Sequence, residues 1–336
     1  MDSLTQFLLG ASIGEAVAGR RFGRVSAVVG GVAATLPDLD VLFPFADAVA
    51  TFTYHRGASH SLLVLALIAP VLAAGFNRLM PLPKRSYRLW LLVVMLALLT
   101  HPLLDAMTVY GTQLLWPLTE FPFGVGSMFI IDPLYSVPLL AALLVGLVSR
   151  RRVSHWNGWA LALTTLYLGL SVGLQTYVRA QVDDAVAALP QPARAVGIVA
   201  TPFNIAAWRV VVVHERDYHV GYLSLLHDAP LVFERYDSRP ELLQPVARHW
   251  PVARLKWFTK GLYAVHERNA EVVVSDLRMG LEPDHYVFSF AVAAVRDGKV
   301  EAAPARRVPA EPYSDGDWRR LAQLIFGFDN GVRPAS

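Results

Sequence analysis

The sequence is short of charge and has no cysteine. Charged residues make up 17% of its 336 residues, whereas soluble domains carry about 25%, and 54% of the residues are hydrophobic. A membrane protein is therefore the first expectation. The absence of cysteine excludes disulfides and thiolate metal sites. The net charge is only +3 and the basic residues cluster in short loops, which favours membrane topology over nucleic-acid binding.

The long apolar runs are confined to the first 180 residues. The opening segment has no basic stretch before its apolar run and includes Glu15. A secretory signal peptide begins with positive charge, so we expect this segment to remain in the mature protein. Two domains are predicted: a membrane-embedded helical domain over 1–180, and a soluble β-rich domain with a C-terminal helix over 195–330.

Six segments of the first domain are candidates for membrane helices. Four have lengths near the about 20 residues that a spanning helix needs, and these are 61–77, 88–106, 134–149 and 156–178. The two earlier segments, 3–19 and 24–36, are shorter and rich in glycine and alanine. They are predicted as close-packed membrane helices, or alternatively as re-entrant or interfacial segments. The predicted fold class is a membrane α-helical bundle of about four to six segments, followed by a small, mainly antiparallel α+β domain.

Basic residues gather in three of the loops between these segments. They are Arg20, Arg21 and Arg24; Arg78, Lys84, Arg85 and Arg88; and Arg150, Arg151 and Arg152. The intervening loops, 37–60 and 107–133, hold few basic residues and several acids. The positive-inside rule places the basic loops in the cytoplasm. Six spans then leave both termini, the polar loops and the C-terminal domain on the outer side.

Beyond residue 195, four segments rich in valine, tyrosine and phenylalanine predict antiparallel strands. They are 208–226, 232–236, 261–280 and 285–295. Ser314 and Asp317 form a capping box at the start of a C-terminal helix. Six histidines of this domain show no ligand spacing and are predicted to be surface or strand residues: His214, His219, His227, His249, His266 and His285.

Four polar stretches fall on one side in this topology. They are LPDLD (36–40), HRGASHS (55–61), THPLLD (100–105) and IIDP (130–133). His101 and Asp105 are spaced i, i+4 on one helical face, and ionisable groups at membrane depth are usually functional. Imidazole and carboxylate ligands suit zinc, manganese or iron. We therefore predict a divalent metal site, with zinc expected first, and its candidate ligands are Asp38, Asp40, His55, His60, His101 and Asp105.

Structural alternatives exist for these ligand candidates. Asp38 and Asp40 fit a solvated turn, and His60 fits a helix start. His101 and Asp105 fit a pair in which the two side chains bind only each other.

Three further residues of the motifs have more than one expected role. Arg56 suits a phosphate or carboxylate clamp, or an interfacial arginine near lipid headgroups. Ser59 is predicted to cap the helix that starts near residue 60 rather than to act as a nucleophile. Asp132 precedes Pro133 and fits a ligand, a base or a helix cap. Arg56 and Asp132 are the candidate catalytic residues.

The motifs occur together in a known family. The opening MDSLTQFLLGASIGEAVAG, then LPDLD, HRGASHSLL, HPLLDAMTVYGTQLLWPL and IIDPLY, resembles the YdjM/YbcI-like family of bacterial inner-membrane proteins over residues 1–180. The later DLRMG resembles an extension found in some members. The resemblance implies a membrane-bound metal-dependent hydrolase of the bacterial inner membrane, in a family described as a domain of unknown function, and it assigns no substrate. Many members have Thr-His where this chain has Thr5 and Gln6, and Gln6 would ligate only weakly through its amide oxygen.

The first functional hypothesis is a membrane-embedded metal-dependent hydrolase acting on a lipid or lipid-linked phosphoester. A bound metal lowers the pKa of a water to about 7 and polarises the scissile group. Asp132 or an unliganded aspartate would act as base, and Arg56 would receive the phosphate. The expected partner is a membrane lipid or lipid-linked substrate, with no nucleic acid, and the expected location of the site is the periplasmic side of the inner membrane.

Two rival hypotheses remain open from the sequence. The chain fits a non-catalytic binding or transport protein, because ion pathways also use intramembrane aspartate and histidine. A closed metal site favours this rival, whereas an open ligand position favours the hydrolase. The third hypothesis makes the C-terminal domain the active part and the membrane domain its anchor.

Overall fold

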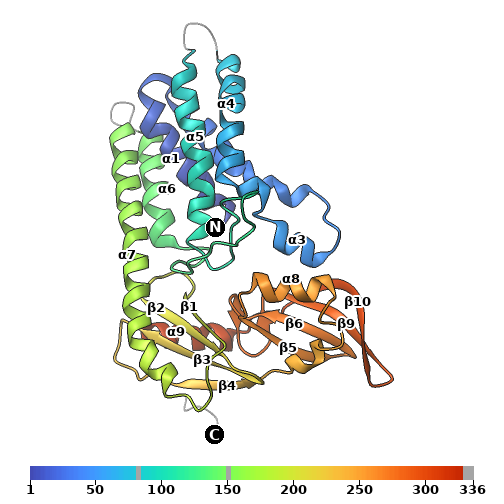
Figure 1. The fold of residues 1–336 in the computed structure, drawn as a ribbon. Coiled ribbons are helices and arrows are strands. Elements are labelled where there is room, and N and C mark those ends of the chain that lie inside the picture. The colour runs from blue at the N-terminus through green and yellow to red at the C-terminus, as the bar shows by residue number, and fades with distance from the viewer. Residues whose placement is uncertain (81–84, 149–152, 328–336) are drawn as a thin grey trace. The chain divides into compact units, whose positions relative to one another are not determined.

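The computed structural model describes residues 1–80, 85–148 and 153–327 (Figure 1). Lys84, Arg150, Arg151 and Arg152 of the predicted basic loops lie outside the described residues. The chain divides into two compact units. The first contains Met1–Pro44, Tyr54–Val172 and Pro202–Asn204, and the second contains Phe45–Thr53, Gly173–Thr201 and the chain from Ile205.

The first unit is helical. Its helices are α1 (Ser3–Phe22), α2 (Arg24–Thr35), α4 (Leu62–Leu79), α5 (Tyr87–Ala106), α6 (Pro133–Val148) and the first part of α7 (Val153–Ala187). Each of the six predicted segments overlaps one of these helices. Among the described residues, three stretches are long and apolar enough to cross a membrane, and they are Leu62–Leu79, Tyr87–Ala106 and His155–Ala187. The predicted fold class, a helical bundle followed by an antiparallel β domain, is confirmed.

Helix α5 forms the centre of this bundle and contacts α1, α2 and α4. Trp90, Val94 and Leu98 of α5 are buried in one core cluster with Phe22 of α1, and the rings of Phe22 and Trp90 stack with their centroids 4.4 Å apart. The surrounding helices expose apolar side chains instead, among them Leu67 and Val71 on α4, Leu134 and Val137 on α6, and Trp159 and Leu166 on α7. Such a continuous apolar exterior suits lipid as the solvent.

Helices α1 and α2 approach each other through glycine. A Cβ atom on Gly30 would lie 2.1 Å from the carbonyl oxygen of Gly10, and one on Gly14 would lie 2.0 Å from the carbonyl oxygen of Ser26. No real Cβ tolerates such distances, so the two backbones touch only because these positions have no side chain. The two glycine-rich segments therefore pack closely against each other, as the first of the two predictions for them stated.

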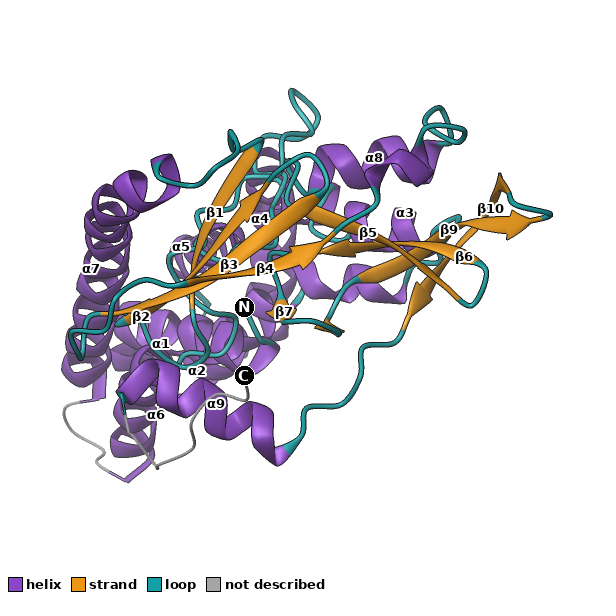
Figure 2. Cartoon of the chain, turned by 90° about the horizontal axis from the view of Figure 1, so that it is seen from below, coloured by secondary structure: helices purple, strands orange, loops and turns teal. Residues whose placement is uncertain are grey.

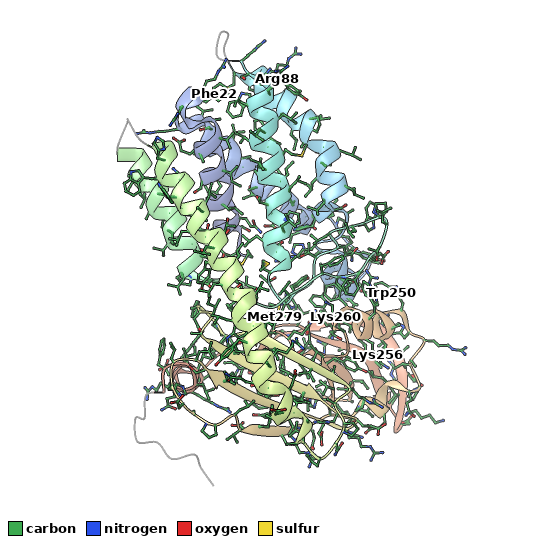
Figure 3. The ribbon with its side chains drawn as sticks, turned by 60° about the vertical axis from the view of Figure 1, so that its left-hand side comes forward. Phe22, Arg88, Trp250, Lys256, Lys260 and Met279 are labelled. Carbon is green, nitrogen blue, oxygen red and sulfur yellow. The ribbon has the colours of Figure 1, made fainter. Side chains whose placement is uncertain are left out.

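The basic ends of three helices meet at one end of the bundle. Figure 3 shows Phe22, which ends α1, and Arg88, near the start of α5, at the same end of this unit. Arg21 Nη2 donates to the backbone oxygen of Arg85 over 3.2 Å, and Arg20 Nη2 lies 2.9 Å from His155 Nε2 at the start of α7. Among the described residues, Arg20, Arg21, Arg85 and Arg88 therefore lie at one end of the bundle.

The second unit contains two four-stranded antiparallel sheets (Figure 2). The first has the order β1 (Ala195–Ala200), β2 (Ala207–Val213), β3 (Asp217–Ser224) and β4 (Phe233–Asp237). The second has the order β10 (Lys299–Val308), β9 (Ser289–Arg296), β6 (Glu271–Asp276) and β5 (Tyr263–Arg268). A further short pair joins β7 (Gly280–Leu281) to β8 (His285–Tyr286). The predicted segments contain all of these except β1 and β10.

One hydrophobic core joins the two sheets. Val211 and Val220 of the first sheet pack with Ala264 of the second and with Tyr286. Phe258 is buried at the end of helix α8 (Trp250–Phe258). The last helix, α9 (Asp315–Phe326), begins at the predicted capping box of Ser314 and Asp317.

A short segment from the first half of the sequence belongs to this second unit. Residues Ala48–Tyr54 form α3, and the ring of Phe52 lies 4.9 Å from Phe258, 4.5 Å from Phe288 and 5.1 Å from Phe290, measured between centroids. The stretch between the polar motifs 36–40 and 55–61 is therefore part of the aromatic core of the second unit.

Candidate metal centre

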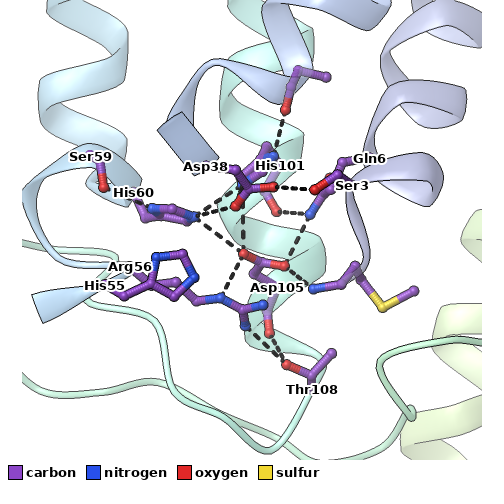
Figure 4. A network of polar contacts seen from close by, with 12 residues as sticks. Ser3, Gln6, Asp38, His55, Arg56, Ser59, His60, His101, Asp105 and Thr108 are labelled. Carbon is purple, nitrogen blue, oxygen red and sulfur yellow. Dashed lines mark hydrogen bonds and ion pairs between the residues drawn. The ribbon is translucent and has the colours of Figure 1, made fainter. Parts of the chain in front are cut away.

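Four ligand side chains converge in the helical unit (Figure 4). Asp38 comes from η1 (Pro37–Leu42), a 3-10 turn that follows α2, and His60 from η2 (Ala58–His60), which precedes α4. His101 and Asp105 lie one turn apart near the end of α5. We refer to these residues as the four-ligand group.

The ligand atoms of this group are spaced like the corners of a tetrahedron. His60 Nε2 lies 3.4 Å from Asp38 Oδ1 and 3.4 Å from Asp105 Oδ2. His101 Nε2 lies 3.5 Å from Asp38 Oδ1, 3.6 Å from Asp105 Oδ2 and 3.1 Å from His60 Nε2. Zinc bonds of about 2.0–2.1 Å give a tetrahedron with edges of about 3.3 Å. These five edges therefore match the spacing that a four-coordinate divalent cation requires.

Helix ends determine the position of the group. Pro37 follows α2 directly and begins η1, which contains Asp38. The i, i+4 spacing of His101 and Asp105 places both on one face of α5. Helix α5 has 20 residues, about 30 Å at 1.5 Å per residue, which is close to the thickness of a bilayer core. Asp105 is the penultimate residue of that helix, so the group lies near one membrane boundary rather than at the midplane.

Each imidazole is oriented by a hydrogen bond at its other nitrogen. His101 Nδ1 lies 2.6 Å from the carbonyl oxygen of Ala34, so Nδ1 carries the proton and Nε2 presents its lone pair to the group. His60 Nδ1 lies 2.9 Å from Ser59 Oγ, which in turn donates to Asp40 Oδ2 over 2.6 Å. Outer partners of this kind orient and tune metal-binding histidines.

Asp40 and His55, both predicted as ligands, lie beside the group. Asp40 Oδ1 is 2.7 Å from His55 Nδ1, and Asp40 Oδ2 also accepts from the backbone N–H of Arg56 over 3.2 Å. Burial would raise the pKa of Asp40, but the hydrogen bonds from His55 and Ser59 outweigh it and lower that pKa. Asp40 is therefore ionised, and its two oxygens contact His55, Ser59 and the backbone N–H of Arg56.

Residues at the start of α1 also reach the group. Gln6 Nε2 donates to Asp105 Oδ1 over 3.0 Å and to the backbone oxygen of His101 over 3.2 Å, and the amino group of Met1 also donates to Asp105 Oδ1. Ser3 Oγ lies 3.5 Å from Asp38 Oδ2. Position 6 is where the sequence hinted at a contact with the group, because many members of the YdjM/YbcI-like family have histidine there. Here Gln6 presents its amide nitrogen, not its oxygen, to Asp105.

Arg56 is buried beside the group. Its backbone has a φ of 63°, and its guanidinium places Nε 3.1 Å from Asp105 Oδ2 and Nη1 3.3 Å from Thr108 Oγ1. The guanidinium also lies 4.7 Å from the ring centroid of Tyr110. The guanidinium of Arg56 therefore places a positive charge next to the carboxylate of Asp105. Its contacts with Asp105, Thr108 and Tyr110 hold it there.

Asp132 makes its contacts elsewhere in the same unit. Its Oδ1 accepts from the backbone N–H of Leu134 over 3.0 Å at the start of α6, and its Oδ2 accepts from Tyr167 over 2.8 Å. These bonds make Asp132 a helix cap, one of its three predicted roles. Its role as catalytic base stays a prediction, and these contacts do not favour it.

The helix cap predicted at Ser59 is wrong. Ser61 is the N-cap of α4, and its hydroxyl accepts from the backbone N–H of Val64. The hydroxyl of Ser59 bonds Asp40 and His60 instead. The prediction failed because η2 occupies residues 58–60 and delays the start of the helix to Leu62.

The group fits a divalent cation. Burial would raise the pKa of Asp38, but hydrogen bonds from His101 and His60 outweigh it and hold that pKa well below its usual range, so Asp38 presents a charged oxygen. Asp105 Oδ2 is buried, forms an ion pair with Arg56 Nε over 3.1 Å and lies 3.4 Å from His60 Nε2 and 3.6 Å from His101 Nε2. Two imidazoles and two carboxylates without sulfur form the borderline donor set that suits zinc, manganese or iron.

Comparison with protein families identifies the helical part of the chain. Residues 1–181 match the family described as YdjM inner membrane protein. The chain belongs to this YdjM family. The match covers the whole four-ligand group and ends before the first strand, β1. Comparisons with curated proteins and with solved structures give no match.

Family membership confirms the resemblance seen in the motifs and establishes a membrane protein of the inner-membrane type. The YdjM match and the three apolar helices agree on the membrane location.

Proposed function

We propose that the chain is a membrane-embedded metal-dependent hydrolase that cleaves a lipid or lipid-linked phosphoester. The observation that carries this proposal is the tetrahedral spacing of Asp38, His60, His101 and Asp105, with edges of 3.1–3.6 Å, at the end of an apolar helix. A divalent cation bound there would supply Lewis acidity and an acidified water.

The side of the group that contains Asp38 suits an apolar substrate. The Asp38 side chain is 19% exposed, whereas those of His60, His101 and Asp105 are at most 1% exposed, so access comes past Asp38. Apolar side chains follow it directly on the surface, and they are Leu39, Val41, Leu42 and Phe43. Exposed apolar patches of this kind mark contacts with lipid or with an apolar ligand.

The charges beside the group favour a phosphoester over a neutral ester. Arg56 holds its guanidinium 3.1 Å from Asp105 Oδ2, and a fixed guanidinium stabilises an anionic phosphate strongly. We assign proton transfer to His55, whose side chain is 27% exposed and whose Nδ1 is held by Asp40. In this assignment His55 and Asp40 act beside the cation, whereas the sequence predicted both as ligands.

The orientation of the chain is part of the same proposal. The basic residues at the end of α1 and the start of α5 would face the cytoplasm by the positive-inside rule, and the four-ligand group and the second unit would then face the periplasm. Because the chain has no cysteine, single cysteines report sidedness cleanly. In intact cells, Leu118→Cys, in the loop after α5, should react with a membrane-impermeant maleimide, and Leu79→Cys, at the end of α4, should not. The reverse pattern would invert the orientation.

A phosphoester assay tests the hydrolase directly. Detergent-purified protein, stripped with chelator and reloaded with zinc, manganese or iron(II), is mixed with phospholipid and with polyprenyl phosphate in micelles. We expect phosphate or headgroup release that falls to background after chelation and in Asp38→Asn. His55→Ala should keep its metal and lose about 10²–10⁴-fold in rate, the usual size of a general acid–base contribution. Cleavage of carboxylic esters with both phosphoesters intact would refute the substrate class.

Closure of the group favours one rival function. Four protein ligands complete a tetrahedron, so a catalytic water would have to enter as a fifth ligand, whereas a four-coordinate site without water is typical of structural or binding sites. A metal-binding or transport protein would bind the cation fully and cleave none of the phosphoesters. Full metal content without any hydrolysis in the assay above would establish this rival.

A further inference from the structure

The hairpin between β2 and β3 brings together three more ligand side chains. His214 follows β2 and Asp217 begins β3. The backbone N–H of His214 donates to the backbone carbonyl oxygen of Asp217 over 2.9 Å. Only Glu215 and Arg216 separate the two, so His214 and Asp217 close the hairpin opposite each other. Cross-strand partners and residues two apart on a strand share a face of the sheet. His219 therefore lies on the same face as the other two, which together we name the hairpin group.

The hairpin group is buried on the face of the sheet away from the main core. Tyr218 and Val220, which alternate with it along β3, pack into the core cluster of the second unit. His214 is 3% exposed, Asp217 is 2% exposed and His219 is 9% exposed. The two imidazole rings lie 4.9 Å apart between centroids at an angle of 88°. The three polar side chains therefore lie together at one buried place.

One atom of each side chain in the hairpin group is left without a partner. Among the described residues, His214 Nε2, Asp217 Oδ1 and His219 Nδ1 are buried and make no hydrogen bond, and the ligand atoms of the three side chains lie within 4.8 Å of one another. His219 Nδ1 is 3.9 Å from Asp217 Oδ1, too far for a hydrogen bond. Nearly all buried polar atoms of native proteins have a hydrogen-bond partner, so three buried atoms without one in the same place indicate a binding site for a ligand.

The opposite atoms of two of these side chains have the partners that metal ligands need. His214 Nδ1 lies 3.2 Å from the carbonyl oxygen of Pro192, so Nδ1 carries the proton and Nε2 presents a lone pair. Asp217 Oδ2 accepts from Arg235 Nε over 2.8 Å, which leaves Oδ1 facing the imidazoles. Metal-binding histidines and carboxylates are oriented by outer hydrogen bonds of this type.

We propose that His214, Asp217 and His219 bind a divalent transition-metal cation in the second unit. Two imidazoles and one carboxylate are a ligand set for zinc or iron(II) that keeps positions open for water or another ligand. The three residues lie beyond 1–181, the part of the chain that matches the YdjM family. The site is thus separate from the four-ligand group and belongs to the C-terminal extension.

Zinc content of the full-length protein tests this site. Wild-type, His214→Ala and Asp217→Asn proteins are purified in detergent, stripped with chelator, equilibrated with zinc and measured by elemental analysis. We expect each variant to bind about one zinc ion fewer per chain than wild type, as loss of a ligand from a three-residue site predicts. The matched control is Glu215→Gln, which removes the same charge from the hairpin at a side chain that is 73% exposed, and it should keep the wild-type content.

Cobalt gives a second readout that does not depend on counting. The difference between wild-type and His219→Ala visible spectra should show the absorption of cobalt bound by imidazole, and circular dichroism should show both proteins folded. Because the result is a difference between variants, it holds whether or not the four-ligand group binds metal. Equal zinc content and equal cobalt spectra in folded variants would overturn the site and leave the hairpin group as a hydrated polar cluster.

Discussion

We expect alanine in place of His101 to abolish binding of the divalent cation proposed for the four-ligand group, whereas asparagine in place of Asp40 should leave it bound. His101 Nε2 forms three of the five measured edges of the tetrahedron, so its loss opens one corner. Asp40 contacts Ser59, His55 and the backbone of Arg56 beside the group, and loss of such an outer partner weakens metal binding about 10–100-fold. Metal content at saturating zinc should therefore separate the two variants, while titration should show the weaker binding of Asp40→Asn.

The comparison is made in a His214→Ala background, so that the hairpin group contributes no ion. His60→Ala and Asp38→Asn should lose the cation as His101→Ala does, and His55→Ala should behave like Asp40→Asn. Equal loss from all five variants would show that these five polar residues ligate or fold as one unit. Retention in His101→Ala would exclude the tetrahedral assignment.

Valine in place of Gly30 should disrupt the α1–α2 pair and with it the four-ligand group. A Cβ at this position would sit 2.1 Å from the Gly10 backbone oxygen, and a backbone atom cannot rotate away as a side chain does. We expect a loss of at least about 3 kcal/mol, the upper end of the usual cost of overpacking. Thermal unfolding in detergent measures it, and zinc affinity should fall as well, because α2 leads directly into Asp38.

Gly75→Val is the matched control for this substitution. Gly75 lies in α4, and a Cβ there would meet nothing within 4 Å, so the same change in helix propensity occurs without a clash. Its melting temperature and zinc affinity should stay near wild type. Equal destabilisation by both variants would show that helix propensity, not the contact between α1 and α2, explains the effect.

The local patterns of the sequence are sufficient for the helices and for the ligand types. Apolar runs predict α4 to α7 because a membrane helix needs many consecutive apolar residues, a signal that any window of the sequence contains. The i, i+4 spacing of His101 and Asp105 likewise places both side chains on one face of a helix, because that spacing is a property of the helix itself.

The separation of ligands from their outer partners cannot be deduced from the sequence. Asp38 and Asp40 are two residues apart, and so close a pair offers two carboxylates of equal chemistry. The difference arises from η1, which turns Asp38 toward His60 and His101 and leaves Asp40 to His55 and Ser59. Long-range packing makes this choice, so a single motif could not reveal it.

The hairpin group escapes sequence prediction for a related reason. His214, Asp217 and His219 follow none of the usual zinc spacings, and their common face depends on the register of β2 against β3. The signal is present all the same. A predicted valine-rich strand, a two-residue loop and a second strand already imply a hairpin that puts the three residues on one face.

The place of Phe52 shows a different limit. The segment around it is short and apolar, as a membrane-boundary loop would be, yet its ring packs against Phe258, Phe288 and Phe290. These partners come more than 200 positions later in the sequence. The pattern within a sequence window cannot reveal such a contact, although the strand that contains Phe290 is predicted from its own composition.

X-ray absorption at the zinc edge of the His214→Ala protein tests the central claim most directly, because it reports the ligand atoms themselves. The four-ligand group predicts two imidazole nitrogens and two carboxylate oxygens at about 2.0–2.1 Å from the ion, and the imidazole signal should be absent in the same protein with His60→Ala and His101→Ala added. A first shell of oxygen alone, or a protein that binds no zinc while folded, would contradict the account.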